Sequence, residues 1–254
     1  MNVAVVQMDV VWEDKPANFR KAHKLIQAAA PPPGTLVALP EMFATGFSLE
    51  AARLAEPAAG PTFEFLAKVA REFQITLIAG LAIRTTEGRF ENHALVVGPD
   101  GSHVAEYAKM RPFRVGGEDS AYSAGTQPIS FTLQDTVIAP FVCFDLRFPE
   151  IFRQIARETA PSLYVVIASW PSPRRHHWLR LLQARAIENQ AYVVGVNRIG
   201  RDPQHEYSGD SVVFDYHGEP LLEVKDRELC AAVSLDLNAL AQYRRDLPFL
   251  ADLR

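Results

Sequence analysis

Cysteine is scarce in this chain, whose 254 residues include only Cys143 and Cys230. The two lie far apart in different local settings, which excludes a disulfide framework and favours a reducing cytoplasm. Long hydrophobic runs are also missing: runs such as residues 163–168 are far too short to span a bilayer, and the first residues carry no basic leader. We therefore expect a cytoplasmic protein that does not enter a membrane.

The chain also lacks the features that bind nucleic acids, nucleotides or metals. Lysine and arginine total 26 against 30 acidic residues, for a net charge of -4, so no basic surface for nucleic acid is predicted. No phosphate loop or dinucleotide fingerprint occurs, and we expect no cofactor. His176 and His177 are adjacent on a predicted helix and point apart, so no metal site is expected there.

What is present is an alternation of short strands and helices, typical of α/β proteins. The periodicity predicts core strands at 3–7, 36–39, 75–79, 136–142, 164–168 and 192–196, and helices at 15–30, 150–157, 172–189 and from position 61. Shorter strands at 94–97, 103–107, 211–215, 221–224 and 230–235 should pair antiparallel. No repeat or linker marks a boundary, so we expect one domain over residues 1–254, an α/β four-layer α-β-β-α sandwich.

The segment 136–152 predicts a strand, a sharp turn and a helix. Its apolar run ends at Cys143, and Pro149 then occupies a position where a helix takes its first turn. A thiol at such a turn lies on the tip of a rigid strand, near the N-terminal dipole of the next helix, and both effects favour the thiolate. The alternative is that Cys143 is a buried small hydrophobic residue, as most free cysteines are.

Glu41, Lys109 and Cys143 each follow the C-terminal end of a predicted core strand, the edge at which open α/β sheets bind ligands. A carboxylate, an amine and a thiol at one edge suit amide hydrolysis. The thiol would attack the carbonyl, the carboxylate would carry the proton to leaving ammonia, and the amine would stabilise the oxyanion. The backbone N–H of Phe144 is the expected second oxyanion donor. Taken singly, Glu41 and Lys109 also fit the description of solvated surface residues.

Three motifs resemble the nitrilase superfamily of carbon-nitrogen hydrolases. They are Leu-Pro-Glu-Met-Phe-Ala-Thr-Gly-Phe around Glu41, Tyr-Ala-Lys-Met-Arg-Pro-Phe around Lys109 and Val-Cys-Phe-Asp-Leu-Arg-Phe-Pro-Glu around Cys143. The match extends through Ala-Ser-Trp-Pro-Ser-Pro-Arg and Tyr-Ser-Gly-Asp-Ser, and so covers nearly the entire chain. The cysteine motif and the later Trp-Pro are most similar to the ω-amidase branch. The resemblance implies a catalytic triad of these three residues, with Glu118 positioning Lys109 or the amide nitrogen.

The ω-amidase branch hydrolyses the terminal amide of α-keto dicarboxylic monoamides such as 2-oxoglutaramate and 2-oxosuccinamate. The resemblance therefore implies a small amide substrate, a thioester intermediate and no cofactor. It also implies assembly into a homodimer or larger homo-oligomer, in which the apolar tail at 247–253 is a candidate for exchange between subunits. This chain has Arg111 where the family commonly has a histidine soon after its lysine, so Arg111 must orient the substrate or the lysine differently.

Several residues near these motifs are candidates for holding the substrate. Arg147 lies four residues after the cysteine and suits a clamp on a substrate carboxylate, with an ion pair to a nearby acid as the alternative. Phe43, Phe47, Phe144 and Trp170 are expected to form the walls of a small dry pocket, or else to pack in the core. Together these residues predict a pocket for a short acid amide.

Two alternatives stay open at this point. Within the amidases, deaminated glutathione or another small aliphatic amide is a competing substrate. Outside them, the chain is a catalytically silent scaffold that keeps the fold for binding. Cys230, followed by two alanines in a predicted strand, is expected to be structural.

Overall fold

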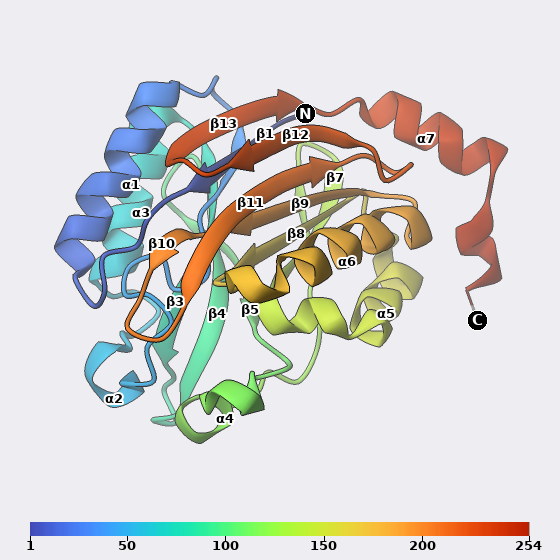
Figure 1. The fold of residues 1–254 in the computed structure, drawn as a ribbon. Helices are drawn as coiled ribbons and strands as arrows, with labels where there is room; N and C mark the ends of the chain where they lie inside the picture. Colours follow the sequence, from blue (N-terminus) through green and yellow to red (C-terminus); the bar gives the residue numbers. More distant parts are fainter. Residues whose placement is uncertain (254) are drawn as a thin grey trace.

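Two β-sheets lie face to face in the computed structural model, which describes residues 1–253 (Figure 1). The strand order is β13-β1-β2-β3-β4-β5 in the first sheet and β10-β11-β9-β8-β7-β6 in the second, where β12 pairs with β11. Helices α1 and α3 cover the outer face of the first sheet, and α5 and α6 lie on the second (Figure 1). The predicted four-layer α/β fold class is therefore confirmed.

The elements have the following bounds. The strands are β1 (Asn2–Gln7), β2 (Leu36–Ala38), β3 (Thr76–Arg84), β4 (Phe90–Val97), β5 (His103–Ala108), β6 (Phe131–Leu133), β7 (Thr136–Val142), β8 (Leu163–Ala168), β9 (Tyr192–Asn197), β10 (Ile199–Arg201), β11 (Glu206–Phe214), β12 (Pro220–Lys225) and β13 (Leu229–Ser234). The α-helices are α1 (Lys15–Ala29), α2 (Ala51–Leu54), α3 (Pro61–Phe73), α4 (Glu118–Ala121), α5 (Pro149–Thr159), α6 (Arg175–Glu188) and α7 (Leu237–Asp246).

Strand periodicity explains how the first sheet sits between two apolar layers. In β1, Val3 and Val5 join the core between the two sheets, whereas Ala4 and Val6 pack on the helix side. Because successive side chains in a strand point to opposite faces, a segment buried on both sides is apolar on both faces, as residues 3–6 of β1 and all of β2 are. The parallel pairs β1–β2, β2–β3, β7–β8 and β8–β9 bring the ends of the core strands to one edge of each sheet.

The shorter strands pair as expected. Strands β3, β4 and β5 form an antiparallel meander, and β13 returns antiparallel to β1. Cys230 lies in β13 opposite Val6 and is buried, in agreement with a structural role. No helix within residues 1–253 is long and apolar enough to cross a bilayer.

The helix expected at 172–189 begins later than the sequence indicated. Ser172–Arg174 forms a single 3-10 turn, η3, and the α-helix starts at Arg175. The indole Nε1 of Trp170 donates to the carbonyl of Arg174 at 2.9 Å, which ties this turn back to the end of β8. The turn therefore carries Arg174 toward the pocket described below.

Candidate active site

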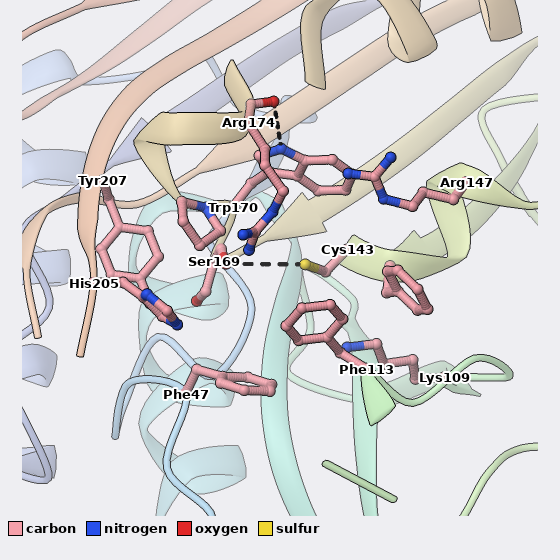
Figure 2. Close-up of a pocket in the computed structure, with 12 residues that line it drawn as sticks. Phe47, Lys109, Phe113, Cys143, Arg147, Ser169, Trp170, Arg174, His205 and Tyr207 are labelled. Atoms are coloured by element: carbon pink, nitrogen blue, oxygen red, sulfur yellow. Dashed lines mark hydrogen bonds between the residues drawn. The ribbon is translucent and has the colours of Figure 1, made fainter. Parts of the chain in front are cut away.

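The structure brings the three strand-end residues together. Glu41 follows β2, Lys109 follows β5 directly and Cys143 follows β7 directly. The Lys109 Nζ donates to Glu41 Oε1 at 2.8 Å, and both charges act on the Cys143 thiol. Figure 2 shows the Cys143 and Lys109 side chains in one pocket. Strands β2 and β5 run in the same direction within one sheet, and β7 belongs to the facing sheet, so the three residues follow strand ends on both sides of the interface between the sheets.

Glu41 is fully buried and held on both of its oxygens. Oε1 accepts from Lys109 Nζ and from Asn92 Nδ2, each at 2.8 Å. Oε2 accepts from the backbone N–H of Ser169 at 2.8 Å. These donors fix the carboxylate near the Cys143 thiol, whose pKa it raises, while the thiol itself donates to the Ser169 carbonyl at 4.0 Å. A carboxylate beside the thiol is suited to act as its general base.

Glu118 lies on the opposite side of the same ammonium group. Lys109 Nζ is 2.7 Å from Glu118 Oε2 and 3.0 Å from Oε1, and the Phe113 backbone N–H donates to Oε2 at 2.6 Å. Burial lowers the pKa of Lys109, but the Glu118 and Glu41 carboxylates raise it more, so its pKa lies above the usual range. Lys109 therefore stays a cation at neutral pH.

Cys143 has a strained backbone and a neutral thiol. Its φ of +48° lies in the left-handed region, which non-glycine residues rarely occupy. Burial and the Glu41 carboxylate raise the pKa of Cys143 well above its usual range, and Lys109 lowers it by less. The expectation that the turn favours the thiolate is therefore wrong. The α-helix begins only at Pro149, so the thiol lies in the 3-10 segment η2 (Cys143–Arg147), away from that helix terminus.

Asp145 stabilises the turn that carries the cysteine. Its carboxylate accepts from the Tyr107 hydroxyl and the Arg111 backbone N–H at 2.8 Å, and from the Val142 backbone N–H at 3.1 Å. Burial raises the pKa of Asp145 to about 7, although Lys109 and these donors lower it. The buried acid thereby links β5 to the end of β7.

A pocket opens above Cys143 and encloses about 420 Å³, part of it open to solvent. The lining residues come from both sheets and from the loops at their edge (Figure 2): Phe47, Lys109, Phe113, Cys143, Phe144, Arg147, Ser169, Trp170, Pro171, Arg174, His205 and Tyr207. A largely apolar and aromatic lining with a few polar groups is typical of a small-molecule site. Of the four aromatic residues expected to form the walls or else to pack in the core, three line the pocket. Phe43 instead packs in the core against Phe19 and Phe65.

Two arginines face this pocket without an acidic partner. The Arg147 guanidinium stacks on Trp170 at 4.8 Å and lies 3.1 Å from His177 Nδ1. The Arg174 guanidinium stacks on Phe113 at 5.4 Å. Within residues 1–253, neither guanidinium forms an ion pair, so the alternative that Arg147 pairs with a nearby acid does not hold. Desolvation and the charge of Arg174 lower the pKa of Arg147, as expected for two neighbouring cations.

Arg111 turns away from the pocket. Its guanidinium stacks on Phe148 at 5.3 Å and lies 3.7 Å from Glu150. Only its backbone contributes to the site, through the N–H that binds Asp145. The side chain that replaces the expected histidine therefore does not line the pocket beside Cys143.

Sequence reasoning missed several residues of this site. Asn92 and Ser169 contact Glu41, and Arg174, His205 and Tyr207 line the pocket. A usable signal existed for Asn92, since it is a polar residue on the face of β4 that otherwise carries the apolar residues of the inter-sheet core. His205 and Tyr207 come from the β10–β11 hairpin, far along the chain. Tyr207 opens the Tyr-Ser-Gly-Asp-Ser motif, which pointed to the family but not to a place in the pocket, and no pattern marks His205.

Gly80→Ala is expected to lower kcat by up to about 100-fold, because displacements near 1 Å have costs of this size. A Cβ at Gly80 would lie 2.4 Å from the Glu41 Cα and 2.5 Å from the Met42 N, so the backbone carrying the base must move. Steady-state kinetics measure the loss. Gly88→Ala lies in a distant hairpin where a Cβ meets nothing within 4 Å, but its φ of +79° strains a non-glycine residue. This control should lower stability while kcat stays at the wild-type value. Unchanged kcat in the Gly80 variant would contradict this reading.

Several known proteins are similar to this chain over nearly its full length. A family model described as carbon-nitrogen hydrolase matches residues 2–245. Omega-amidase YafV of Escherichia coli K12 is 36% identical, over 99% of this chain and 96% of that protein. The 2-oxoglutaramate amidase of Bacillus subtilis is 31% identical, over 99% of this chain and 97% of that protein. A similar solved structure is the crystal structure of XC1258 from Xanthomonas campestris, a CN-hydrolase superfamily protein with an arsenic adduct in its active site. It has a TM-score of 0.93 and 34% sequence identity, and the match covers 99% of this chain and 96% of that chain.

Proposed function

Because this chain belongs to the carbon-nitrogen hydrolase family and is a hydrolase acting on amides, we propose that it cleaves the terminal amide of 2-oxoglutaramate and 2-oxosuccinamate. The products are the α-keto dicarboxylate and ammonia. One observation carries the proposal: a thiol, a buried carboxylate and a buried ammonium meet beneath a pocket that also presents two unpaired guanidinium groups. We further propose that the enzyme works in the reducing cytoplasm, where a free thiol persists.

In the first half of the reaction, the Cys143 sulfur attacks the amide carbonyl while Glu41 takes the thiol proton. Proton transfer must accompany attack, because the resting thiol is neutral. The oxyanion receives hydrogen bonds from Lys109 Nζ and from the Phe144 backbone N–H, in the first turn of η2 where a helix leaves its donors free. Glu41 then returns the proton to the departing nitrogen, the C–N bond breaks, and ammonia leaves a thioester on Cys143.

The second half uses the same groups in reverse. Water attacks the thioester carbonyl and Glu41 takes one proton from it. The C–S bond breaks, the proton returns to sulfur, and the carboxylic acid product leaves with the enzyme restored. Glu118 takes no proton in this scheme; with Glu41 it holds the Lys109 ammonium in place.

The α-keto acid end of the substrate is assigned to the arginine side of the pocket. The guanidinium group of Arg147 stacks on the Trp170 ring, and that of Arg174 stacks on the Phe113 ring. These contacts orient the two guanidinium groups without neutralising their charge. A carboxylate accepts two parallel hydrogen bonds from a guanidinium, so it satisfies this end of the pocket. The second candidate substrate class, deaminated glutathione and other small amides, is favoured only if activity does not depend on the substrate carboxylate.

Arg147→Met is expected to raise the KM for 2-oxoglutaramate by about 10- to 100-fold, because one charge-assisted hydrogen bond is worth about 1.5–3 kcal/mol. The methionine keeps an apolar side chain on the Trp170 face. Ammonia release is measured with 2-oxoglutaramate and with an uncharged amide of similar length. The exposed Arg157→Met on α5 is the control. An equal loss of activity on both substrates would contradict the assignment of Arg147 to the substrate carboxylate.

We also propose that the chain assembles into a homodimer or larger homo-oligomer through its C-terminal end. Leu247 and Phe249 are apolar yet 41% and 56% exposed. Figure 1 shows α7 and the following 3-10 segment η4 (Phe249–Asp252) extending beyond the sheets. Light scattering tests the proposal: a mass of two or more subunits supports it, and a monomer at micromolar concentration contradicts it.

A further inference from the structure

Asn92 is a buried polar residue in a strand that has no structural need for one. It lies in β4 and is 1% exposed. Its side chain shares a face with Ala94 and Val96, which belong to the apolar core between the sheets. Burying an amide among such neighbours costs free energy unless its hydrogen bonds are made. The contacts of Asn92 therefore identify what it does.

Both side-chain hydrogen bonds of Asn92 are to predicted catalytic groups. The Nδ2 atom donates to Glu41 Oε1 at 2.8 Å and to Glu118 Oε1 at 2.9 Å. The backbone carbonyl of Asn92 accepts from the Lys109 N–H at 2.8 Å. The Oδ1 atom has no hydrogen-bond partner among the described residues. One residue thus holds both carboxylates and the strand end that carries the lysine.

The hydrogen bonds divide the two oxygens of Glu41 unequally. A carboxylate oxygen has two lone-pair sites, and both sites of Oε1 are used, by Asn92 and Lys109. Oε2 accepts only from the Ser169 N–H, which leaves one site free. We propose that Asn92 is a positioning residue that saturates Glu41 Oε1 and so makes Oε2 the oxygen that exchanges protons with the thiol and the leaving group. This inference rests on the proposed amidase function.

An amide is suited to this place because it donates without adding charge. The charged and titratable groups around it are Glu41 after β2, Lys109 after β5, Cys143 after β7, and Glu118 and Tyr122 on and beside α4. Two carboxylates already share one ammonium there, so a third would be repelled. A neutral donor that binds both carboxylates reduces their mutual repulsion.

Asn92→Ala is therefore expected to lower kcat by about 10- to 100-fold with little change in KM, since Asn92 does not line the pocket. The acidic limb of the pH–rate profile should move to higher pH, because a carboxylate that loses a donor binds a proton more readily. Asn189→Ala is the matched control: Asn189 is equally buried, donates through Nδ2 to one backbone carbonyl, and also has an unpartnered Oδ1, but lies at the end of α6. It should match the stability loss without the change in pH profile.

Asn92→Asp tests the same idea at nearly constant shape. The introduced carboxyl group can donate only when protonated, so activity should be lowest above neutral pH and recover as the pH falls. The pH midpoint for alkylation of Cys143 by iodoacetamide should rise, because a further carboxylate disfavours the thiolate. This readout needs no substrate and survives even if the alanine variant does not fold.

The results distinguish failure of the Asn92 positioning role from failure of the proposed amidase function. A kcat for Asn92→Ala within about twofold of wild type, or an aspartate variant whose pH profile equals that of wild type, would overturn the positioning role. Parallel losses of kcat in the Asn92 and Asn189 variants would assign the effect to packing and overturn it too. A wild-type protein inactive on every amide would count against the proposed function instead, while the shift in alkylation midpoint would still support the arrangement around Glu41.

Discussion

Glu41→Gln is expected to lower kcat by about 10²- to 10⁴-fold, the range that a general acid-base group contributes. Glutamine keeps the shape of the side chain and accepts from Lys109, but it cannot carry a proton between the thiol, the leaving nitrogen and water. The same change removes a negative charge that raises the pKa of Cys143, an effect second in size only to that of burial. The thiol should therefore alkylate with iodoacetamide at a lower pH midpoint than in the wild type.

In this variant, alkylation of Cys143 and turnover of the amide are expected to change in opposite directions. If Glu41 served only to generate thiolate, reactivity toward iodoacetamide and turnover of the amide would fall together. The proton-shuttle account predicts that alkylation becomes easier while turnover collapses. Glu64→Gln, on the exposed side of α3, is the control and should change neither quantity. A glutamine variant with wild-type kcat would remove Glu41 from the mechanism.

Lys109→Met is expected to cost both activity and stability. Loss of an oxyanion donor reduces kcat by about 10²- to 10³-fold. The variant also leaves the fully buried Glu41 and Glu118 without their shared cation, and breaking a buried pair in this way costs about 3–5 kcal/mol. Urea unfolding at pH 5 and pH 8 measures the free energy of unfolding.

The sign of the pH dependence follows from the unpaired carboxylates. Without the ammonium, the folded state of the variant favours protonated carboxyl groups more than the unfolded state does. The stability loss should therefore be largest at pH 8 and shrink as the pH falls toward 5. The exposed Lys68→Met on α3 should show no such trend. Equal stability of the Lys109 variant and wild type at pH 8 would show that the buried ion pairs are not as described.

Much of the fold could be predicted because local patterns and global packing agree. The apolar residues 3–6 of β1 and the apolar β2 are buried on both faces, and the strand ends at Glu41, Lys109 and Cys143 meet at one edge, as the sequence pattern indicated. The start of the helix expected at 172–189 was predicted three residues too early. The turn at Ser172–Arg174 is held by a tertiary hydrogen bond from Trp170, which no local pattern reveals.

The site itself was less predictable for a physical reason. The ionisation of Cys143 depends on burial and on Glu41, two facts of tertiary structure that outweigh the local turn. The position of Glu118 came from family resemblance alone, since its loop has no regular pattern. Phe43 and Phe47 are four residues apart in the segment after β2, but Phe43 packs in the core beneath α1 and α3 while Phe47 lines the pocket.

The central claim is that the Cys143 sulfur forms a covalent bond to the acyl part of the amide, with Glu41 carrying the proton. Rapid acid quenching of wild-type enzyme during turnover of 2-oxoglutaramate, followed by intact and peptide mass spectrometry, tests it most directly. The account predicts a mass gain equal to the acyl group on the peptide that contains Cys143, absent in Cys143→Ala. Ammonia release at the wild-type rate by Cys143→Ala, or an acyl group found on another residue, would contradict it.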